Sequence, residues 1–551
     1  MSKEKTREFV FGLLVATIAF LVYANSLGNG FTLDDDSVIL NNPILKGSFF
    51  SIFSSIDTTG ETQLLPFYRP ITYLTFMAEW HLHGFNPFLV RLANVLLHSA
   101  NTFLVYRLAR TLNKDNIYMA LLAGLLFAVH PQHSEGVDFN AGGRNTMLAC
   151  FFSISTYLLH NKSIIRDRMY WAFTGALLFL AGILSKETAL MILPFIVAIE
   201  IQALRTSAPG NRHRPFLRLV PYFAAVALYM VMRWLTLSKF GIQTSIIPGV
   251  GTKLIESLYI ITDLNTRLLN DLYIIPHYLL TAIWPVGLSS RYVIPDDLNL
   301  LALPLFGGWF CILAGLGWLM TRGRSSTSLF GLTWVLLFWL PVSGIVFVPG
   351  AQLADRFFYI PEVGLWIIIS DQFYRYLPVN KPILRKIAVT AVVSILLVLA
   401  GLTIRRNMDW RSNYALYVSL VEHYPENIHA HAGLGNVFYG KGTEHDTDLA
   451  EKEFEKVLAI DPNFPMIFTR LGNIKLNKED LSGALYCYSK AIEVYPYDKE
   501  ARLNRGITLE KLGRPREAIT DYIFFLTSPG NSNDIPGGKE HAEKRLRELS
   551  K

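Results

Sequence analysis

Three consecutive carboxylates, Asp34, Asp35 and Asp36, directly follow the first apolar run of the sequence. Adjacent carboxylates beside a bilayer repel one another, so they require either full solvation or a cation, a sugar hydroxyl or a proton. The solvated start of a loop would meet this requirement, and so would a reactive site in which one carboxylate accepts a proton. The other polar motifs of the chain favour the reactive site.

Those other motifs place cations and hydrogen-bonding groups between apolar runs. Five cations are candidates for binding a phosphate: Arg69, Arg144, Lys186, Arg291 and Arg356. Further candidates for binding a substrate are Asp36, Tyr68, His98, His130, His133, Glu135, Glu187, Asp355 and Tyr359. An acidic cluster with separated cations and histidines suits the transfer of a group that is carried on a lipid phosphate.

The chemistry of such a transfer needs few groups. The leaving phosphate is already a stable anion, so it requires cations near it rather than a general acid. One carboxylate, Asp34 or Asp35, then suffices as the general base that deprotonates an acceptor hydroxyl, and the attack inverts the sugar carbon. Glycoside hydrolysis, by contrast, usually needs two carboxylates.

Several motifs also allow a structural interpretation. His98 lies with Asn94 in an apolar segment, where it is either a hydrogen-bonded core residue or a functional group. His130, His133 and Glu135 have the ligand types of a divalent metal site, but they serve equally well to bind a sugar or to orient the acidic loop, and we expect no cofactor.

Two further pairs have the same ambiguity. Lys186 and Glu187 could form a turn between two helices from which both side chains reach water, and Asp355 and Arg356 could pair with each other. We expect Lys186 to contact phosphate.

The composition indicates a membrane protein. The chain has 551 residues, of which 51% are hydrophobic and 17% are charged. Eleven apolar runs have about the length that crosses a bilayer: 9–25, 88–112, 117–134, 142–160, 169–184, 187–203, 217–236, 302–321, 328–348, 357–374 and 387–404. Segment 251–286 is interrupted by charges and prolines, so we expect re-entrant or interfacial helices there.

The basic residues predict the orientation in the membrane. The net charge is +7, but the basic residues fall in clusters on every second connection, which is a topology signal rather than a nucleic-acid site: Lys3, Lys5, Arg7; Arg107, Arg110, Lys114; Lys162, Arg166, Arg168; Arg205, Arg212, Arg214, Arg218; Arg322, Arg324; Arg375, Lys381, Arg385 and Lys386. We therefore expect a cytoplasmic N-terminus, a retained first helix, and the polar motifs on the opposite face. The three cysteines form no paired spacing that would indicate zinc or a disulfide framework.

The last part of the chain repeats itself. Ala450, Ala484 and Ala518 recur at the period of tetratricopeptide repeats, as do Gly472 and Gly506. We expect an all-α protein with a membrane domain over 1–404, an adaptor helix over 405–426 and a repeat domain over 427–551, with repeats at 427–463, 464–497 and 498–531. Such a solenoid either binds a protein partner, here the acceptor, or only caps the membrane domain.

Taken together, the motifs resemble a known family. The motifs are Phe31-x-x-Asp34-Asp35 with Asn42-Pro43, Tyr68-Arg69-Pro70, Asn94-x-x-x-His98, His130-Pro131-x-His133-x-Glu135, Gly143-Arg144, Ser185-Lys186-Glu187 and Asp355-Arg356-x-x-Tyr359-x-Pro361. With the terminal repeats, they resemble the transmembrane O-mannosyltransferases that carry tetratricopeptide repeats, and their bacterial relatives.

The resemblance implies a GT-C fold glycosyltransferase that uses a polyprenyl-phosphate sugar, with Asp34 and Asp35 as the catalytic pair. It implies a mannose or similar hexose, a Ser or Thr hydroxyl as acceptor, and a bacterial inner membrane with the repeats in the periplasm.

The competing function is a scaffold or transporter whose repeats recruit an export or assembly partner. Transporters bind their substrates at the midplane of the membrane and usually contain an internal repeat within the membrane domain. The sequence shows no such duplication, and its charges lie at one end of the apolar runs. An interfacial site for a lipid-bound donor is therefore favoured.

Overall fold

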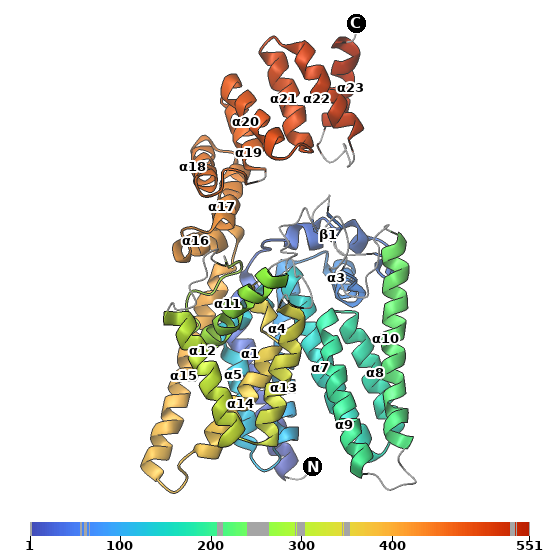
Figure 1. The fold of residues 1–551 in the computed structure, drawn as a ribbon, viewed down its shortest axis with the longest axis vertical. Helices are drawn as coiled ribbons and strands as arrows, with labels where there is room; N and C mark the ends of the chain where they lie inside the picture. Colours follow the sequence, from blue (N-terminus) through green and yellow to red (C-terminus); the bar gives the residue numbers. More distant parts are fainter. Residues whose placement is uncertain are drawn as a thin grey trace. The chain divides into compact units, whose positions relative to one another are not determined.

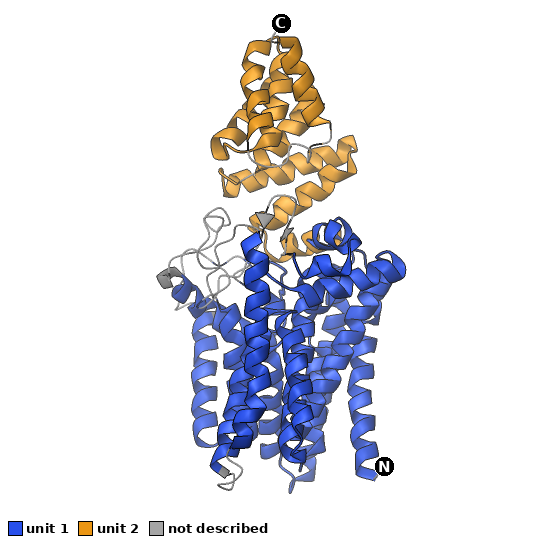
Figure 2. Ribbon diagram, turned by 90° about the vertical axis from the view of Figure 1, so that its right-hand side faces the viewer, with its two compact units in different colours: residues 1–412 blue, residues 413–551 orange. Residues whose placement is uncertain are grey.

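The chain divides into two compact units, residues 1–412 and 413–551, coloured separately in Figure 2. The computed structural model describes residues 3–55, 58–59, 63–64, 67–206, 213–239, 264–292, 294, 303–343, 345, 353–464, 466–528, 535 and 537–549. The all-α class predicted from the sequence is confirmed, because helices make up nearly all the regular structure of the described residues.

The first unit is a bundle of long helices. They are α1 (Lys3–Tyr23), α4 (Pro87–Leu112), α5 (Ile117–Val129), α7 (Asn140–Arg166), α8 (Met169–Ile183), α9 (Ile192–Thr206), α10 (His213–Lys239), α11 (Leu264–Ile283), α12 (Leu303–Thr321), α13 (Ser326–Trp339), α14 (Pro361–Tyr376) and α15 (Pro382–Asp409). Each of the eleven predicted apolar runs overlaps one of these helices, and residues 302, 344 and 346–348 of the runs lie outside the described residues.

Some of these helices are long and apolar enough to cross a membrane. Among the described residues they span Lys3–Gly28, Pro87–Leu112, Glu187–Arg205, His213–Lys239 and Pro382–Asp409. Ile117–Val129, Met169–Ile183, Leu305–Thr321 and Ser326–Val342 form shorter apolar helices.

Small residues let the helices approach closely, as is usual where lipid surrounds a bundle. A methyl group on Gly331 or Gly364 would clash with the backbone of the other, so α13 and α14 pack backbone to backbone. Gly124 of α5 likewise faces Val15 and Tyr106, which brings α5 against α1 and α4.

The short elements connect the long helices. They are η1 (Ala24–Gly28), η2 (Asp36–Leu40), η3 (Pro43–Lys46), α2 (Phe49–Ile52), β1 (Thr58–Thr59), β2 (Gln63–Leu64), α3 (Pro70–His83), η4 (Pro131–His133), α6 (Ser134–Asp138), η5 (Glu187–Met191), η8 (Leu340–Val342) and η9 (Asp355–Phe357). Strands β1 and β2 pair antiparallel, with Thr58 opposite Leu64. In Figure 1, β1 and α3 lie at the end of the bundle opposite the N-terminus.

The predicted interfacial segment 251–286 is described only in part. Residues 251–263 lie outside the described residues, and α11 then runs to Ile283 as one helix with Pro276 inside it. Figure 1 shows α11 at the same end of the bundle as α3.

The second unit consists of helix pairs. After α16 (Asn413–His423) come α17 (Ile428–Lys441) with α18 (Glu444–Ile460), α19 (Ile467–Asn477) with α20 (Leu481–Val494), α21 (Lys499–Lys511) with α22 (Pro515–Thr527), and a last helix α23 (Gly538–Leu549). Gly435, Gly472 and Gly506 each face an aromatic ring of the paired helix, namely Phe454, Tyr488 and Tyr522.

The boundary between the units lies later than position 404. The apolar pattern stops at 404, but α15 continues to Asp409 because Arg406 and Asn407 are buried within the first unit. Residues 405–409 thus belong to the last helix of the first unit, and only Asn413–His423 forms a separate helix before the repeats.

Candidate functional site

The acidic loop, residues 31–40, gives its three carboxylates different surroundings. Leu33 adopts the left-handed conformation with φ 52°, which is strained for a branched side chain, and a π-helical turn follows at Asp36–Leu40. Asp35 is buried, whereas Asp34 and Asp36 are exposed. The loop therefore separates one anchored carboxylate from two accessible ones.

Asp35 is held by three N–H donors. Its Oδ2 accepts from the Thr32 backbone N–H at 3.1 Å and from Asn140 Nδ2 at 2.8 Å, and its Oδ1 accepts from the Ala141 backbone N–H at 2.7 Å. Burial raises the pKa of Asp35 to about 6, although these three donors and the charge of Arg91 oppose that shift. Asp35 therefore joins the acidic loop to the start of α7.

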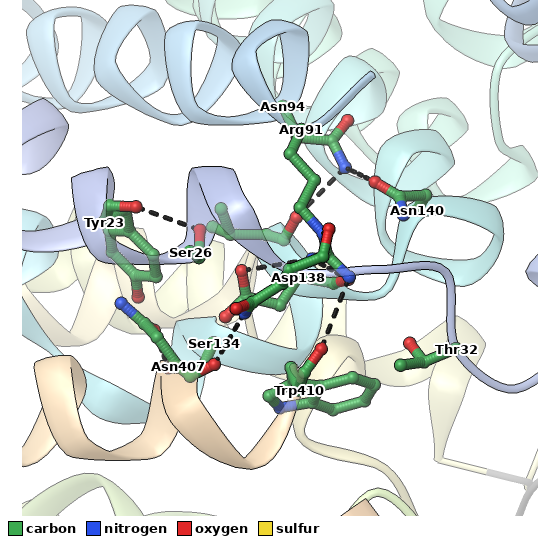
Figure 3. Close-up of polar contacts among 12 residues, drawn as sticks. Tyr23, Ser26, Thr32, Arg91, Asn94, Ser134, Asp138, Asn140, Asn407 and Trp410 are labelled. Carbon is green, nitrogen blue, oxygen red and sulfur yellow. Dashed lines mark hydrogen bonds and ion pairs between the residues drawn. The ribbon is translucent and has the colours of Figure 1, made fainter. Parts of the chain in front are cut away.

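Arg91 of α4 contacts the residues just before the same loop, and Figure 3 shows its guanidinium near Asp138 and Trp410. Its guanidinium donates to the carbonyl oxygens of Asn29 at 3.0 Å, Asp138 at 2.7 Å and Trp410 at 3.4 Å, and also to that of Gly30. It also forms an ion pair with Oδ1 of Asp138 at 3.5 Å. Burial raises the pKa of Asp138 to about 7, and Arg91 opposes that shift.

Neither Arg91 nor Asp138 was among the predicted site residues. Arg91 lies inside the predicted apolar run 88–112, and a charged residue inside such a run is itself a functional signal. Asp138 carries no comparable signal in the sequence, because its burial comes from the packing of α6 on α4 and α15.

Two of the predicted cations lie beside the ring of Phe357, and a third lies close to one of them. The ammonium of Lys186 is 5.3 Å from the ring centroid, and the guanidinium of Arg356 is 4.9 Å from it. Arg69 is close enough to Lys186 for the two charges to repel. We call Arg69, Lys186 and Arg356 the cation cluster.

Two glutamates compensate part of this positive charge. Arg69 Nη2 lies 3.1 Å from Oε2 of Glu187. Arg356 donates its backbone N–H to Glu135 Oε2 at 2.9 Å, and its guanidinium also pairs with Glu135.

Lys186 has no such compensation. Its ammonium donates to Thr146 Oγ1 at 2.6 Å and forms no ion pair with any carboxylate that the structure describes. Burial and the charges of Arg69 and Arg356 lower its pKa well below the ordinary value. A buried lysine that donates only to a hydroxyl, beside two arginines, has the composition of an anion site.

The other two predicted cations lie apart from this cluster. Arg144 is buried, and its guanidinium donates to Asn94 Oδ1 at 2.6 Å, Glu79 Oε1 at 2.5 Å and the Val90 carbonyl at 2.9 Å. Arg291 is exposed. Arg144 thus joins α7 to α3 and α4, and a phosphate contact for Arg144 or Arg291 stays a prediction.

The predicted histidines are buried inside the bundle. His98 Nδ1 lies 2.8 Å from the hydroxyl of Tyr359, which also accepts from Asn101 Nδ2 at 3.2 Å. His133 Nε2 is 2.9 Å from Oε2 of Glu362. These contacts join α4 and η4 to the start of α14.

The remaining candidates also have protein partners. His130 Nε2 is 2.9 Å from the Ala282 carbonyl, and Tyr68 donates to the Phe53 carbonyl at 3.0 Å. Asp355 accepts from the Tyr292 hydroxyl at 2.8 Å, and burial together with the charge of Glu135 raises its pKa well above the ordinary value. Substrate binding by these residues stays a prediction.

The acidic loop and the cation cluster contact opposite ends of segment 135–141. Asp35 binds Asn140 and Ala141 at the end of this segment, and Arg356 binds Glu135 at its start. The guanidinium of Arg356 lies 5.4 Å from the ring of Phe139, between the two. Within the described residues no group of three His, Cys, Asp or Glu side chains has the arrangement of a metal site. One segment thus contacts both the acidic loop, which carries two exposed carboxylates, and the cation cluster.

Comparisons with known proteins show what the chain is similar to. The family profile described as dolichyl-phosphate-mannose-protein mannosyltransferase matches residues 70–237, and a tetratricopeptide repeat profile matches residues 487–520. A Caenorhabditis elegans protein O-mannosyl-transferase, F38B6.6, is 28% identical over 82% of this chain and 63% of its own length. The mouse protein O-mannosyl-transferase TMTC3 is 26% identical over 95% of this chain and 64% of its own length.

The chain is similar over most of its length to proteins named protein O-mannosyl-transferase. The resemblance predicted from the motifs is thereby confirmed. The Drosophila melanogaster protein O-mannosyl-transferase Tmtc2 is 37% identical over 32% of the chain and 20% of its own length. The chain spans a little under two thirds of the length of the worm and mouse relatives.

Proposed function

We propose that the protein is a membrane glycosyltransferase that transfers a hexose, mannose or a close analogue, from a polyprenyl phosphate to the hydroxyl of a protein Ser or Thr. The observation that carries the proposal is the buried Lys186, flanked by Arg69 and Arg356 and donating only to Thr146 among the described residues. The relationship to protein O-mannosyl-transferases supports the sugar and the protein acceptor.

The cation cluster would receive the phosphate of the donor. A phosphodiester that loses its sugar gains negative charge, and a guanidinium can meet two phosphate oxygens with parallel hydrogen bonds. Arg69 and Arg356 each already face one glutamate, so they can exchange part of that contact for the phosphate. Lys186 would supply the charge that the protein itself leaves uncompensated.

Asp34 is the better candidate for the base within the pair. It is exposed, whereas all three hydrogen bonds to Asp35 come from the protein and hold that carboxylate in place. Asp34 takes the proton of the acceptor hydroxyl while the hydroxyl oxygen attacks the anomeric carbon. The bond from that carbon to the phosphate oxygen breaks, the electron pair leaves with the phosphate, and the sugar carbon is inverted.

The proposal also assigns faces and partners. The basic clusters favour a cytoplasmic N-terminus, and the acidic loop lies near the opposite end of the bundle, so the reaction would occur on the non-cytoplasmic face of a bacterial inner membrane. The repeats of the second unit would engage the acceptor in the periplasm, as helical repeats commonly bind extended partners.

The test is a transfer assay with the full chain in membranes. Labelled polyprenyl-phosphate mannose is supplied with a Ser/Thr-containing acceptor protein, and both the labelled product and its anomeric configuration are determined. We expect a product inverted relative to the donor, and a loss of turnover of about a hundredfold or more in Asp34→Asn, with a loss in Asp35→Asn as well.

The matched control is Asp115→Asn, which removes an exposed carboxylate from the connection between α4 and α5 and should leave turnover unchanged. Wild-type turnover in both Asp34→Asn and Asp35→Asn would exclude the pair as the base. An inserted wild-type protein that transfers no hexose from any polyprenyl phosphate would favour the scaffold or transporter function instead.

A further inference from the structure

We propose that Arg91 and Asn407 are positioning residues that fix the base of the acidic loop, residues 22–30, against the end of α15. The inference rests on the proposed function of the acidic loop, because it assigns these two residues to the placement of Asp34. Neither side chain is exposed to solvent beyond 1% of its surface, so neither can meet a substrate directly.

Two side chains and one backbone N–H of the loop base donate to the last residues of the first unit. Asn25 donates its side-chain amide to the Ile404 carbonyl at 2.8 Å, and Asn29 donates to the Asn407 carbonyl at 2.8 Å. The Gly30 backbone N–H donates to the Arg411 carbonyl at 3.1 Å. Three residues of the loop base therefore donate hydrogen bonds to carbonyl oxygens along segment 404–411.

Asn407 adds contacts through its own side chain, which Figure 3 shows beside Ser134. Its Nδ2 donates to the Val22 carbonyl at 3.1 Å and to Asn25 Oδ1 at 2.8 Å, and its Oδ1 accepts from Ser134 Oγ at 3.1 Å. The loop base, α6 and α15 are thus joined by one amide whose donors and acceptor are all used.

Arg91 of α4 contacts the loop base, the end of α15 and α6 at once. Its planar group binds the carbonyls of Asn29 and Gly30 on the loop base, that of Trp410 after α15, and Asp138 of α6. Five N–H donors in a rigid fork suit several acceptors at fixed angles, which the single ammonium of a lysine cannot reproduce. Only three residues separate Gly30 from Asp34, so the direction in which Asp34 leaves the bundle follows from these contacts.

A positioning role and a general structural role predict different results. The test compares the full-chain variants Arg91→Lys and Asn407→Ala with Arg218→Lys, in which another buried arginine loses its paired hydrogen bonds to Glu200 at 2.7 and 2.9 Å. Amide hydrogen exchange is measured by mass spectrometry over residues 31–40 and over the rest of the first unit. Turnover and the donor KM are measured on the same samples.

We expect Arg91→Lys and Asn407→Ala to speed exchange in residues 31–40 by tenfold or more and to lower turnover to a similar extent, with the donor KM unchanged. Arg218→Lys should leave the exchange of this loop and turnover unchanged. The proposal would be overturned if Arg91→Lys and Asn407→Ala showed the same amide exchange in residues 31–40 as Arg218→Lys. It would also be overturned if their exchange were faster across the whole first unit. A raised donor KM with unchanged turnover would overturn it as well, because it would make Arg91 a ligand of the donor.

The exchange measurement also separates this inference from the proposed function. If the protein transfers no sugar, amide hydrogen exchange in residues 31–40 should still be faster in Arg91→Lys and Asn407→Ala. The positioning role would then be supported although the proposed reaction is wrong. If Arg91→Lys does not fold, Asn407→Ala decides the question alone.

Discussion

The cation cluster shows how a single buried residue can distinguish a binding site from a structural ion pair. Arg69 and Arg356 each have a glutamate partner, whereas Lys186 donates to a hydroxyl. The charges of Glu187 and Glu135 act on its ammonium, but no described carboxylate is in direct contact with it. A residue retained for stability would be expected to have that direct contact. The arrangement is understandable if the compensating charge arrives with the donor.

Replacing this lysine should therefore separate binding from stability. We expect Lys186→Met to raise the donor KM about tenfold or more while the midpoint of thermal unfolding stays the same or rises, because a buried unpaired charge is removed. Lys186→Arg serves as the charge-preserving comparison. A lower unfolding midpoint together with an unchanged donor KM would show that Lys186 serves the fold and not the phosphate.

Asp35 provides a prediction about pH. Burial raises its pKa from 3.8 to about 6, so between these values the folded protein holds a proton on Asp35 that the unfolded chain has lost. Lowering the pH between these two values therefore does not reduce the free energy of unfolding on account of Asp35. A protonated Asp35, however, can no longer accept from all three of its N–H donors without rearrangement.

We expect turnover to fall with a midpoint near pH 6 as the pH is lowered, without a parallel fall in the thermal midpoint caused by Asp35. Turnover and thermal unfolding measured between pH 5 and 8 on the same membrane samples would check this. An acid limb centred near pH 4 would mean that the ionisation of Asp35 does not control the loop.

At the scale of the elements, the buried histidines and tyrosines join helices that are distant in the sequence. Tyr359, two residues before α14, bonds to His98 and Asn101 of α4, and its ring also lies against His133 of η4. These contacts fix the connection between η4 and α7, which carries Glu135 and Asn140.

Tyr359→Phe tests whether that contact is structural or binds a substrate. Removing the hydroxyl leaves His98 and Asn101 without this partner in a buried position, so we expect a loss of about 1–3 kcal/mol in the free energy of unfolding. The donor and acceptor KM values should stay unchanged. Tyr157→Phe is the matched control, since Tyr157 is buried but its hydroxyl has no hydrogen bond to any described residue. A raised KM for either substrate in Tyr359→Phe would instead support substrate binding.

The sequence predicted the elements better than the contacts between them. Apolar runs and the spacing of Ala450, Ala484 and Ala518 are local patterns, so helices and repeats could be read from them directly. The pairing of Arg91 with Asp138 and Trp410 joins parts of the chain 47 and 319 residues apart, and no local pattern encodes it. For the same reason His98 and Tyr359 could each be recognised as candidates, while their contact with each other could not.

At the scale of the whole molecule, the division into two units allows a truncation experiment. Ending the chain after residue 404 would remove Asn407 and Trp410 together with the repeats, so the informative cut is after Ser412. We expect the truncated protein to keep donor binding, while transfer to the natural acceptor falls steeply because the acceptor is no longer held near the reaction.

Donor binding and transfer to a short Ser-containing peptide at high concentration provide the controls for that experiment. Aggregation or lost donor binding after the cut would indicate that the repeats serve to stabilise the first unit. A well-folded truncated protein that modifies its natural acceptor at the full rate would exclude a recruiting role.

Under the proposed function, the contacts at the end of α15 would also determine when the protein can become active during its synthesis. Asn29 and its carbonyl partner on Asn407 are 378 residues apart, and α15 is the last helix of the first unit to leave the ribosome. Until it inserts, the acidic loop lacks its support from Ile404, Asn407, Trp410 and Arg411. Under the proposed function, a partly made chain that lacks α15 would contain the preceding helices of the first unit without a fixed acidic loop, and it would not transfer sugar.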